Sequence, residues 1–411
     1  MQWNRLSRKQ YRLMSWWADE NAGYNAVIAD GSIRSGKTLC MVCSFVLWAM
    51  TNYDGQLFGV CGKTIASLRR NVILPLANGL AGICKITEHR ADNRLTVEYG
   101  GHKNEFYLFG GKDESSYMLI QGITLAGVMF DEVALMPQSF VNQAMGRCSV
   151  AGAKMWFNCN PESPSHWFYT DWIGQSDKRN ALYLHFTMND NPSLPEERRR
   201  WYESQFDGVF YDRYIKGLWV KAEGLVYPMF DKSRTFDTLP AAQYRYFISI
   251  DYGTQNPFSA GLWAVDSFRR VAYRLREYYY GGRERKKQLT DEEYYAEVEK
   301  LAGNLPAEYL VIDPSAASFI AAVRRHGRFS VRKAVNDVLD GIRVVSSMLR
   351  AGMVLIHSGC ADSIREFGLY SWDADAKGDD KVLKENDHAM DDIRYFCYTI
   401  LAREFKWGNW G

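Results

Sequence analysis

The chain has 411 residues, which is long enough for two domains, and its net charge is +2. That near balance neither favours nor excludes a nucleic-acid partner, because a basic surface can be confined to one part of a protein. Residues 1–17 lack the apolar centre of a signal peptide, and the longest apolar run, 39–50, is shorter than the roughly 20 residues that a membrane span needs. With scattered cysteines in apolar stretches, the expectation is a soluble, intracellular protein without a membrane partner.

A glycine-containing run at residues 31–38, GSIRSGKT, fits the pattern G-x-x-x-x-G-K-[ST] of a phosphate-binding loop. An apolar strand is predicted before it, at 26–29, and a buried helix after it, at 39–50. The glycines let backbone N–H groups curl around phosphate oxygens, Lys37 supplies a positive charge, and the Thr38 hydroxyl can reach Mg²⁺. We therefore predict that ATP binds at Gly31, Ser35, Gly36, Lys37 and Thr38.

The rest of the first half alternates between strand-like and helix-like segments. Strands are predicted at 57–61, 95–99, 105–108, 126–130 and 154–157, and helices at 65–80 and 138–147. The two strands that flank Gly100 and Gly101 predict a hairpin. The alternation predicts a mostly parallel sheet wrapped by helices. From 182 to 230, turn clusters and a charged helix at 195–206 predict a connecting region that closes the first domain near residue 225.

Two acidic residues end the strand at 126–130. Asp131 is predicted to hold Mg²⁺ through water, and Glu132 to orient and deprotonate the attacking water. A solvated acidic pair is the alternative, and the phosphate loop upstream favours the catalytic interpretation. Asn160, which follows the next strand, is expected to contact the γ-phosphate or its water, with an ordinary Asn-Pro turn as the alternative.

Two arginines are candidates for stabilising charge on the γ-phosphate. Arg34 lies inside the loop and Arg147 follows the helix at 138–147. Either residue fits equally well as a structural surface arginine.

The second half begins with three successive strands at 246–251, 259–265 and 271–280. Helix and strand then alternate: helices are predicted at 291–302, 316–325, 336–351 and 388–405, and strands at 309–313 and 353–357. This order is the one expected of a ribonuclease-H-like fold. The predicted organisation is α/β throughout, with an ATPase domain at 1–225, a linker at 226–242 and a ribonuclease-H-like domain at 243–411.

Acidic residues follow two of these strands and begin the last helix. Asp251 and Asp313 end strands, and His388, Asp391 and Asp392 can share one face of the helix. In the expected fold, three carboxylates can meet around two Mg²⁺ or Mn²⁺ ions, which suit phosphodiester hydrolysis. Acids far apart in sequence do not establish a site by themselves, and helix N-termini attract aspartate anyway.

Taken as an ordered set, these motifs resemble the large terminase subunits of tailed bacteriophages. The resemblance covers the whole chain and is carried by GSIRSGKT, GVMFDE, FNCNP, NDNP at 189–192, GLW at 217–219, ISIDYG, VIDPSA and NDHAMDDIRY. It also includes Gln10, which resembles the glutamine that reads adenine in the family. Asp392 stands where a smaller residue is more usual, so Asp391 and Asp392 can exchange roles.

The resemblance implies an N-terminal P-loop ATPase of the RecA/ASCE type and a C-terminal nuclease. It implies that Asp251, Asp313 and Asp391 bind the nuclease metals with His388 assisting. ATP hydrolysis would drive double-stranded DNA into a procapsid, and the nuclease would cut concatemeric DNA. The implied partners are a portal protein, a small terminase subunit and further copies of the chain in a ring, all in the host cell cytoplasm.

Two other functions remain open at this stage. One is an ATP-dependent DNA-binding scaffold whose ribonuclease-H-like domain is inactive. The other is a helicase or repair ATPase, which the lack of a second ATPase pattern disfavours. The densest basic runs, 198–200 and 283–287, are more simply solvated charge than DNA contacts.

Overall fold

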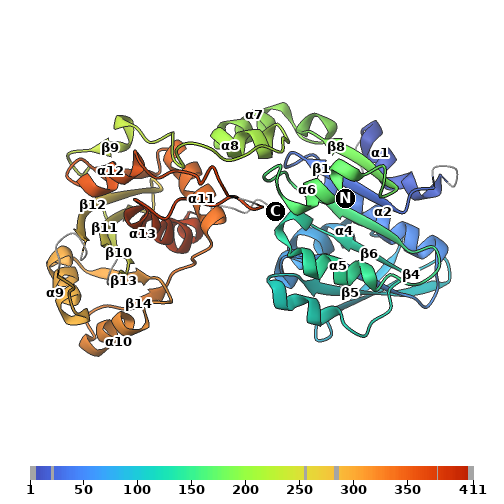
Figure 1. Ribbon diagram of the computed structural model, residues 1–411, viewed down its shortest axis with the longest axis horizontal. Helices are drawn as coiled ribbons and strands as arrows, with labels where there is room; N and C mark the ends of the chain where they lie inside the picture. Colours follow the sequence, from blue (N-terminus) through green and yellow to red (C-terminus); the bar gives the residue numbers. More distant parts are fainter. Residues whose placement is uncertain (1–5, 20–22, 254–256, 282–286, 377, 406–411) are drawn as a thin grey trace.

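The computed structural model of the chain describes residues 6–19, 23–253, 257–281, 287–376 and 378–405. Within these residues, an eight-stranded sheet lies in the first half and a seven-stranded sheet in the second. Figure 1 shows the sheets in separate lobes, with helices α7 (Glu196–Gln205) and α8 (Gly208–Phe210) between them. The fold is therefore α/β in both halves, as predicted.

The first sheet has the strand order β3-β4-β5-β2-β6-β7-β1-β8. Its strands are β1 (Ala26–Gly31), β2 (Leu57–Gly62), β3 (Lys85–His89), β4 (Arg94–Tyr99), β5 (His102–Gly110), β6 (Gly127–Phe130), β7 (Lys154–Asn158) and β8 (Ala181–Phe186). All neighbours from β5 to β8 pair in parallel, whereas β3, β4 and β5 form antiparallel pairs. The mostly parallel sheet and the hairpin at Gly100 and Gly101 are confirmed. Because the carboxyl ends of parallel strands share one edge, β1, β7 and β6 bring their following residues together.

Helices pack on both faces of this sheet. They are α1 (Arg8–Ser15), α2 (Lys37–Asn52), α3 (Ile65–Leu68), α4 (Leu74–Gly79), α5 (Gln138–Gly146) and α6 (Trp167–Asp171). Along β1, Val27 and Ala29 belong to the core cluster that contains α2, while Ala26 and Ile28 belong to the cluster that contains α5. Alternating residues of a strand point to opposite faces, so both faces are buried and the strand is apolar throughout.

Strand β8 lies inside the region that the sequence predicts to be a connection. It pairs in parallel with β1 over its whole length. As an end strand of the sheet, it leaves Tyr183 exposed and Leu184 half-buried. It therefore lacks the continuous apolar run by which the inner strands are recognised.

The second sheet has the order β14-β13-β10-β11-β12-β15-β9. Its strands are β9 (Thr235–Phe236), β10 (Arg245–Asp251), β11 (Phe258–Asp266), β12 (Val271–Tyr280), β13 (Ala307–Ile312), β14 (Val331–Lys333) and β15 (Val354–His357). Strand β10 is antiparallel to β11 and parallel to β13. Three antiparallel strands followed by parallel ones form the predicted ribonuclease-H-like arrangement. The short strands β9 and β14 were not predicted.

Helices cover this sheet on both faces. They are α9 (Asp291–Ala302), α10 (Ala317–His326), α11 (Val338–Arg350), α12 (Ala361–Phe367), α13 (His388–Phe396) and α14 (Ala402–Glu404). Helix α12 was not predicted. In β10, Phe247 faces the cluster with α11 and α13, and Ile248 and Ile250 face the cluster with α9 and α10. Helix α13 crosses β10 and β11, which places its first turn near the end of β10.

The connecting region shares its core with the second lobe. Phe206, Phe210 and Tyr214 belong to the same buried cluster as Phe247 and Trp263 of the second sheet. The half-buried Ile33 of the phosphate loop packs against that cluster as well. The connecting region therefore contacts the phosphate loop on one side and the second lobe on the other.

Candidate active sites

The phosphate loop runs from the end of β1 to the first residue of α2. Gly31 has φ +121°, and a Cβ there would lie 1.9 Å from the carbonyl oxygen of Phe186. Gly36 has φ +85° and directly precedes α2. Only glycine fits at position 31, because any side chain would collide with the backbone of β8. The pairing of β1 with β8 is therefore a second reason for this glycine, besides the phosphate loop.

Lys37 is buried at the centre of the loop. Its Nζ donates to the carbonyl oxygens of Gly31 at 3.0 Å and Ser32 at 2.8 Å, and to Asn160 Oδ1 at 3.2 Å. Ser35 Oγ donates to the Ser32 carbonyl at 3.0 Å. Burial lowers the pKa of Lys37, and the negative charge of Glu132 opposes that effect. The loop thus holds a buried amine, whose positive charge can attract an incoming anion away from its present carbonyl partners.

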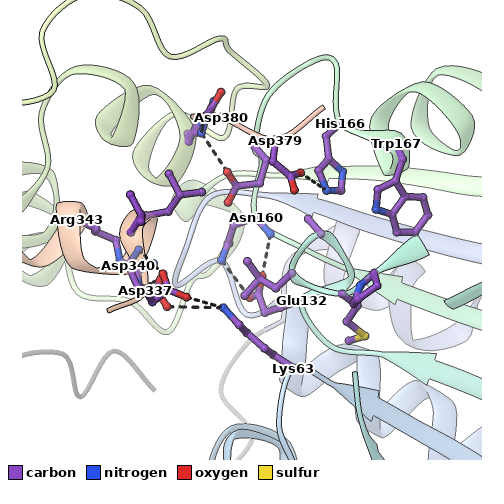
Figure 2. A pocket seen from close by; sticks show the side chains of 18 of the residues that line it. Lys63, Glu132, Asn160, His166, Trp167, Asp337, Asp340, Arg343, Asp379 and Asp380 are labelled. Atoms are coloured by element: carbon purple, nitrogen blue, oxygen red, sulfur yellow. Dashed lines mark hydrogen bonds and ion pairs between the residues drawn. The ribbon is translucent and has the colours of Figure 1, made fainter. Parts of the chain in front are cut away.

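Asn160 joins Lys37 to Glu132. Its backbone N–H donates to Glu132 Oε2 at 3.1 Å and its side-chain amide to Glu132 Oε1 at 3.0 Å (Figure 2). Its Oδ1 accepts from Lys37. Glu132 adopts φ +57°, an uncommon conformation for a residue with a side chain. Because β7 lies between β1 and β6, the chain after β7 is in reach of both neighbours. The structure therefore brings three predicted site residues into one hydrogen-bonded group.

Asp131 lies beside Thr38. The Thr38 hydroxyl donates to Asp131 Oδ1 at 3.4 Å, and the Asn158 amide donates to the same oxygen at 2.9 Å. Burial, reinforced by repulsion from Glu132, raises the pKa of Asp131 to about 7. A carboxylate and a hydroxyl are oxygen ligands of the kind that Mg²⁺ prefers, so this pair fits the ion predicted from the sequence.

Gln10 and Arg34 flank the loop. Gln10 is buried and its Nε2 donates to the Ser35 carbonyl at 3.2 Å. Arg34 has φ +57°, and its guanidinium carbon lies 5.3 Å from the centre of the Tyr202 ring on α7. The other candidate arginine, Arg147, follows the last turn of α5.

In the second lobe, Asp251 and His388 are in direct contact. Asp251 ends β10, and its Oδ2 lies 2.8 Å from Nδ1 of His388, the first residue of α13. Burial raises the pKa of Asp251 to about 7, and the contact with His388 opposes the rise. Burial lowers the pKa of His388, but the hydrogen bond to Asp251 and the negative charges of Asp251, Asp387 and Glu366 together outweigh it, so that pKa lies above its ordinary value.

Asp313 and Asp391 lie near this pair without joining it. Asp313 follows β13, whose Ile312 is in register with Ile250 of β10, and it accepts from the backbone N–H of Ser315 at 2.7 Å. Asp391 accepts from Arg394 Nη2 at 2.9 Å. No group of three His, Cys, Asp or Glu side chains is arranged to hold a metal ion within the described ranges.

Tyr395 lies within the electrostatic influence of all three carboxylates. Its pKa is raised mainly by burial, and in addition by the negative charges of Asp251, Asp391 and Asp313. The three predicted acids therefore lie in one region of the second lobe. Carboxylate oxygens are suited to Mg²⁺ or Mn²⁺, and the donor set matches the predicted metals in kind.

Asp392 points into the core instead. It accepts from Arg274 Nη2 at 2.9 Å and from Ser249 Oγ at 2.7 Å, and both Asp392 and Arg274 are completely buried. Its carboxylate is thereby fully paired with partners on the sheet. This geometry favours Asp391 over Asp392 as the third acidic residue of the site.

Comparisons with known proteins identify the family of the chain. A family model described as terminase large subunit, T4likevirus-type, N-terminal, matches residues 28–234. A crystal structure of the large terminase from a thermophilic bacteriophage is 50% identical, covers 97% of this chain and 100% of that chain, and has a TM-score of 0.92. The chain belongs to the large terminase family. Curated protein sequences yielded no match.

Two further structures of the same thermophilic phage terminase were determined with nucleotides. The complex with ADP is 49% identical, covers 96% of this chain and 100% of that chain, and has a TM-score of 0.90. The complex with ATP-γ-S is 48% identical, covers 97% and 100%, and has a TM-score of 0.89.

Three residues of this terminase were not assigned a role from the sequence. Asn158 contacts both Asp131 and the backbone N–H of Glu132 at 3.0 Å, and its signal was its place in the FNCNP run. Tyr395 lies in NDHAMDDIRY, and only the fold shows what surrounds it. Arg213 had no signal at all, because its partners are distant in the sequence.

Arg213 lies in a pocket between the lobes, with a cavity volume of about 760 Å³. Arg213 Nη1 pairs with Glu162 at 3.0 Å and also with Asp380 of the second lobe. Lys63 Nζ lies 3.5 Å from Asp337 of the second lobe, just before α11 (Figure 2). Glu132 and Asn160 line the same pocket, so these two predicted site residues face the second lobe.

Neither basic run is assigned a contact with DNA. Residues 198–200 lie on α7, and of the run 283–287 only Lys287 is inside the described residues, where it pairs with Glu293 at 3.3 Å. Among the helices described, none combines the length and apolar character needed to cross a membrane.

Proposed function

We propose that this terminase hydrolyses ATP to translocate double-stranded DNA into a procapsid and cuts concatemeric DNA with its second domain. The proposal includes an ATPase domain at 1–225, a linker at 226–242 and a nuclease domain at 243–411. The observation that carries it is Asn160, which contacts both Lys37 and Glu132 at the edge of the nucleotide loop. The thermophilic phage relative that was determined with ADP and ATP-γ-S supports nucleotide binding by this chain.

In the ATPase step, Glu132 is the base. It accepts a proton from water as the water oxygen bonds to the γ-phosphorus and the bond between that phosphorus and the ADP oxygen breaks. Lys37 exchanges its contacts with backbone carbonyls for phosphate oxygens, and Gln10 contacts the adenine. Arg34 stabilises charge that develops on the γ-phosphate. Thr38 and Asp131 would hold Mg²⁺, which offsets phosphate charge when bound.

When the γ-phosphate leaves, Asn160 reports the change. Its amide binds Glu132 and its carbonyl oxygen binds Lys37, so displacement of either partner breaks a hydrogen bond of the same side chain. Glu162 lies two residues further along and pairs with Arg213, which also holds the second lobe through Asp380. Hydrolysis would therefore change the contact between the lobes.

In the nuclease step, Asp251, Asp313 and Asp391 would hold two Mg²⁺ or Mn²⁺ ions. Such ions activate water and stabilise the leaving oxygen when bound. His388 would hold the Asp251 carboxylate in place through its Nδ1. For the carboxylate to bind a cation, the proton that burial favours on Asp251 must leave, so cutting requires the deprotonated form.

The proposed partners are those of a packaging motor. They are double-stranded DNA, the portal protein of the procapsid, a small terminase subunit and further copies of this chain in a ring, in the host cell cytoplasm. The direct test is protection of DNA from an added nuclease in the presence of procapsids with portal, ATP and the full chain. Protection by wild type that is absent for Lys37→Ala supports translocation, and equal protection by both contradicts it.

A second candidate is an ATP-dependent scaffold with an inactive nuclease domain. It is favoured by the pairing of Asp391 with Arg394 and of Asp313 with Ser315, which leaves no three acids assembled in the described residues. If wild type cuts DNA with Mn²⁺ and Asp251→Ala does not, the scaffold function is excluded.

A further inference from the structure

A third basic segment begins in the last turns of α10 and ends with β14. Of the ten residues from 324 to 333, five are arginine or lysine and none is acidic. Arg325 pairs with Glu292 at 2.5 Å, and Arg328 pairs with Glu299 at 3.3 Å. Both glutamates belong to α9, so the fold itself neutralises these two charges.

The last two residues of the segment, Arg332 and Lys333, are not neutralised in this way. The guanidinium carbon of Arg332 lies 4.5 Å from the centre of the Tyr309 ring, and Lys333 is exposed. In the part of the chain that the structure describes, neither residue forms an ion pair with an acidic side chain. A guanidinium that rests on a ring keeps the N–H groups at its edge available to an anion. Two positive charges are thus available to an external partner.

These two charges lie at the same edge of the sheet as the predicted nuclease acids. Strand β14 is an end strand and pairs in parallel with β13 (Figure 1), and Lys333 is in register with Ile312. Neighbouring strands are about 4.8 Å apart, and Asp313 directly follows Ile312. Shortly after β14, Asn336 Nδ2 donates to Asp313 Oδ2 at 3.4 Å. The basic pair is therefore next to the chain that carries Asp313.

Arg332 and Lys333 also lie on opposite faces of the sheet, because successive residues of a strand point to opposite sides. Arg332 shares its face with Tyr309, which packs against the cluster that contains α11 and α13. Val331, two residues before Lys333, packs against the cluster that contains α9 and α10. In the sheet as described, no strand covers the outer side of β14. A polymer that crosses this edge can therefore contact both cations.

We propose that Arg332 and Lys333 bind backbone phosphates of DNA beside the bond that Asp251, Asp313 and Asp391 would cut. Their role rests on the proposed nuclease function and gives that site a substrate-binding edge. The carboxylates of the site repel a polyanion, so the substrate needs positive charge beside them in addition to the metal ions. Phosphate contacts fix where the DNA backbone lies without reading its bases, and they make binding depend on salt.

The experiment is plasmid cutting by the full chain with Mn²⁺, measured against DNA concentration at several salt concentrations. Lys333→Gln and Arg332→Gln each remove one charge and keep a polar side chain. One phosphate contact contributes about 0.9 to the slope of log affinity against log salt, so each variant should lower that slope by about 0.9. At 0.1 M salt, each should raise the DNA concentration for half-maximal cutting roughly five- to tenfold, far more than it lowers the maximal rate.

Two matched variants complete the design. Arg332→Lys keeps the charge and should retain the wild-type salt slope. Arg270→Gln removes an exposed charge from the turn between β11 and β12, which lies at the opposite end of the sheet from Asp251. It should match wild type in both quantities. The Tm of each variant shows whether the fold is retained.

Unchanged half-maximal concentrations and salt slopes in both glutamine variants at positions 332 and 333 would overturn the assignment, since the two residues would then be solvated surface charge. An equal change in Arg270→Gln, or a loss confined to the maximal rate, would overturn it as well. If wild type itself does not cut, the nuclease proposal fails separately. Binding of a fluorescent DNA duplex without divalent ions, followed by anisotropy, then decides the matter: a lower salt slope in both variants supports the phosphate contacts, and an unchanged slope contradicts them.

Discussion

Removal of the Asp392 carboxylate tests how the second domain is held together. Asp392 accepts two hydrogen bonds from Arg274 and one each from Ser249 and Ser259, in a place where neither charged residue reaches solvent. Asp392→Ala removes every hydrogen bond that Asp392 accepts from Arg274 and leaves the buried guanidinium with Glu277, 3.8 Å away, as its remaining counter-charge. Breaking one partner of a buried pair costs about 3–5 kcal/mol of the free energy of unfolding.

That cost translates into a measurable shift of the melting temperature. For a domain of 150–250 residues, each kcal/mol lowers Tm by roughly 2–4 °C, so Asp392→Ala should lower it by about 6–20 °C. Calorimetry of the full chain measures the shift, and ATP-γ-S identifies the ATPase transition because a ligand raises the Tm of the unit that binds it. The nucleotide-insensitive transition is the one expected to move.

Two further variants separate the charge effect from lost packing. Arg274→Met with Asp392→Leu removes both charges and should recover most of the lost stability. Asp391→Ala should cost less, because Arg394 keeps its hydrogen bonds to the carbonyls of Asn336 and Asp337. An Asp392→Ala variant within about 1 kcal/mol of wild type, or a double variant less stable than the single one, would refute the assigned role of the pair.

Three more outcomes follow from the same contacts. Glu132→Gln should abolish ATP turnover and keep nucleotide binding, since the amide cannot accept the proton; steady-state turnover near the wild-type rate would contradict this. In metal-free protein, Asp251 has a pKa of about 7, against an ordinary 3.8, so the folded state binds its proton more tightly than the unfolded state does. The resulting stabilisation is complete below about pH 4 and is lost as the pH rises through 7. Urea unfolding from pH 4 to 8 should therefore show a smaller decline for Asp251→Asn than for wild type, and identical profiles would argue against the shift. Arg213→Met should destabilise the protein by about 3–5 kcal/mol because Glu162 and Asp380 lose their shared cation, and an unchanged urea midpoint would count against that contact.

Residues whose role depends on local chain geometry were predictable. The phosphate loop requires a strand, a glycine turn and a helix in sequence, and all three are local. Asp131 and Glu132 could be proposed because they follow the apolar strand β6, and Asp251 because it ends β10, where in each case the chain leaves the sheet edge. The contact between Asn160 and Glu132 follows once β7 is known to lie beside β6.

Residues whose role depends on distant partners were not predictable in this way. Asp392 and Arg274 are 118 positions apart, and nothing near either residue signals the pairing. The stacking of Arg34 on Tyr202 likewise depends on how the connecting region folds back over the loop. Strand β8 was missed for a different reason, since an end strand with exposed side chains carries a weak apolar pattern.

The division of labour between the two domains is the central claim, and crossed variants test it most directly. ATP turnover and plasmid cutting with Mn²⁺ are measured on full-length wild type, Glu132→Gln and Asp251→Ala. We expect Asp251→Ala to lose cutting and keep turnover, and Glu132→Gln to lose turnover and keep metal-dependent cutting. Loss of both activities in either folded variant would contradict two separate sites in this terminase.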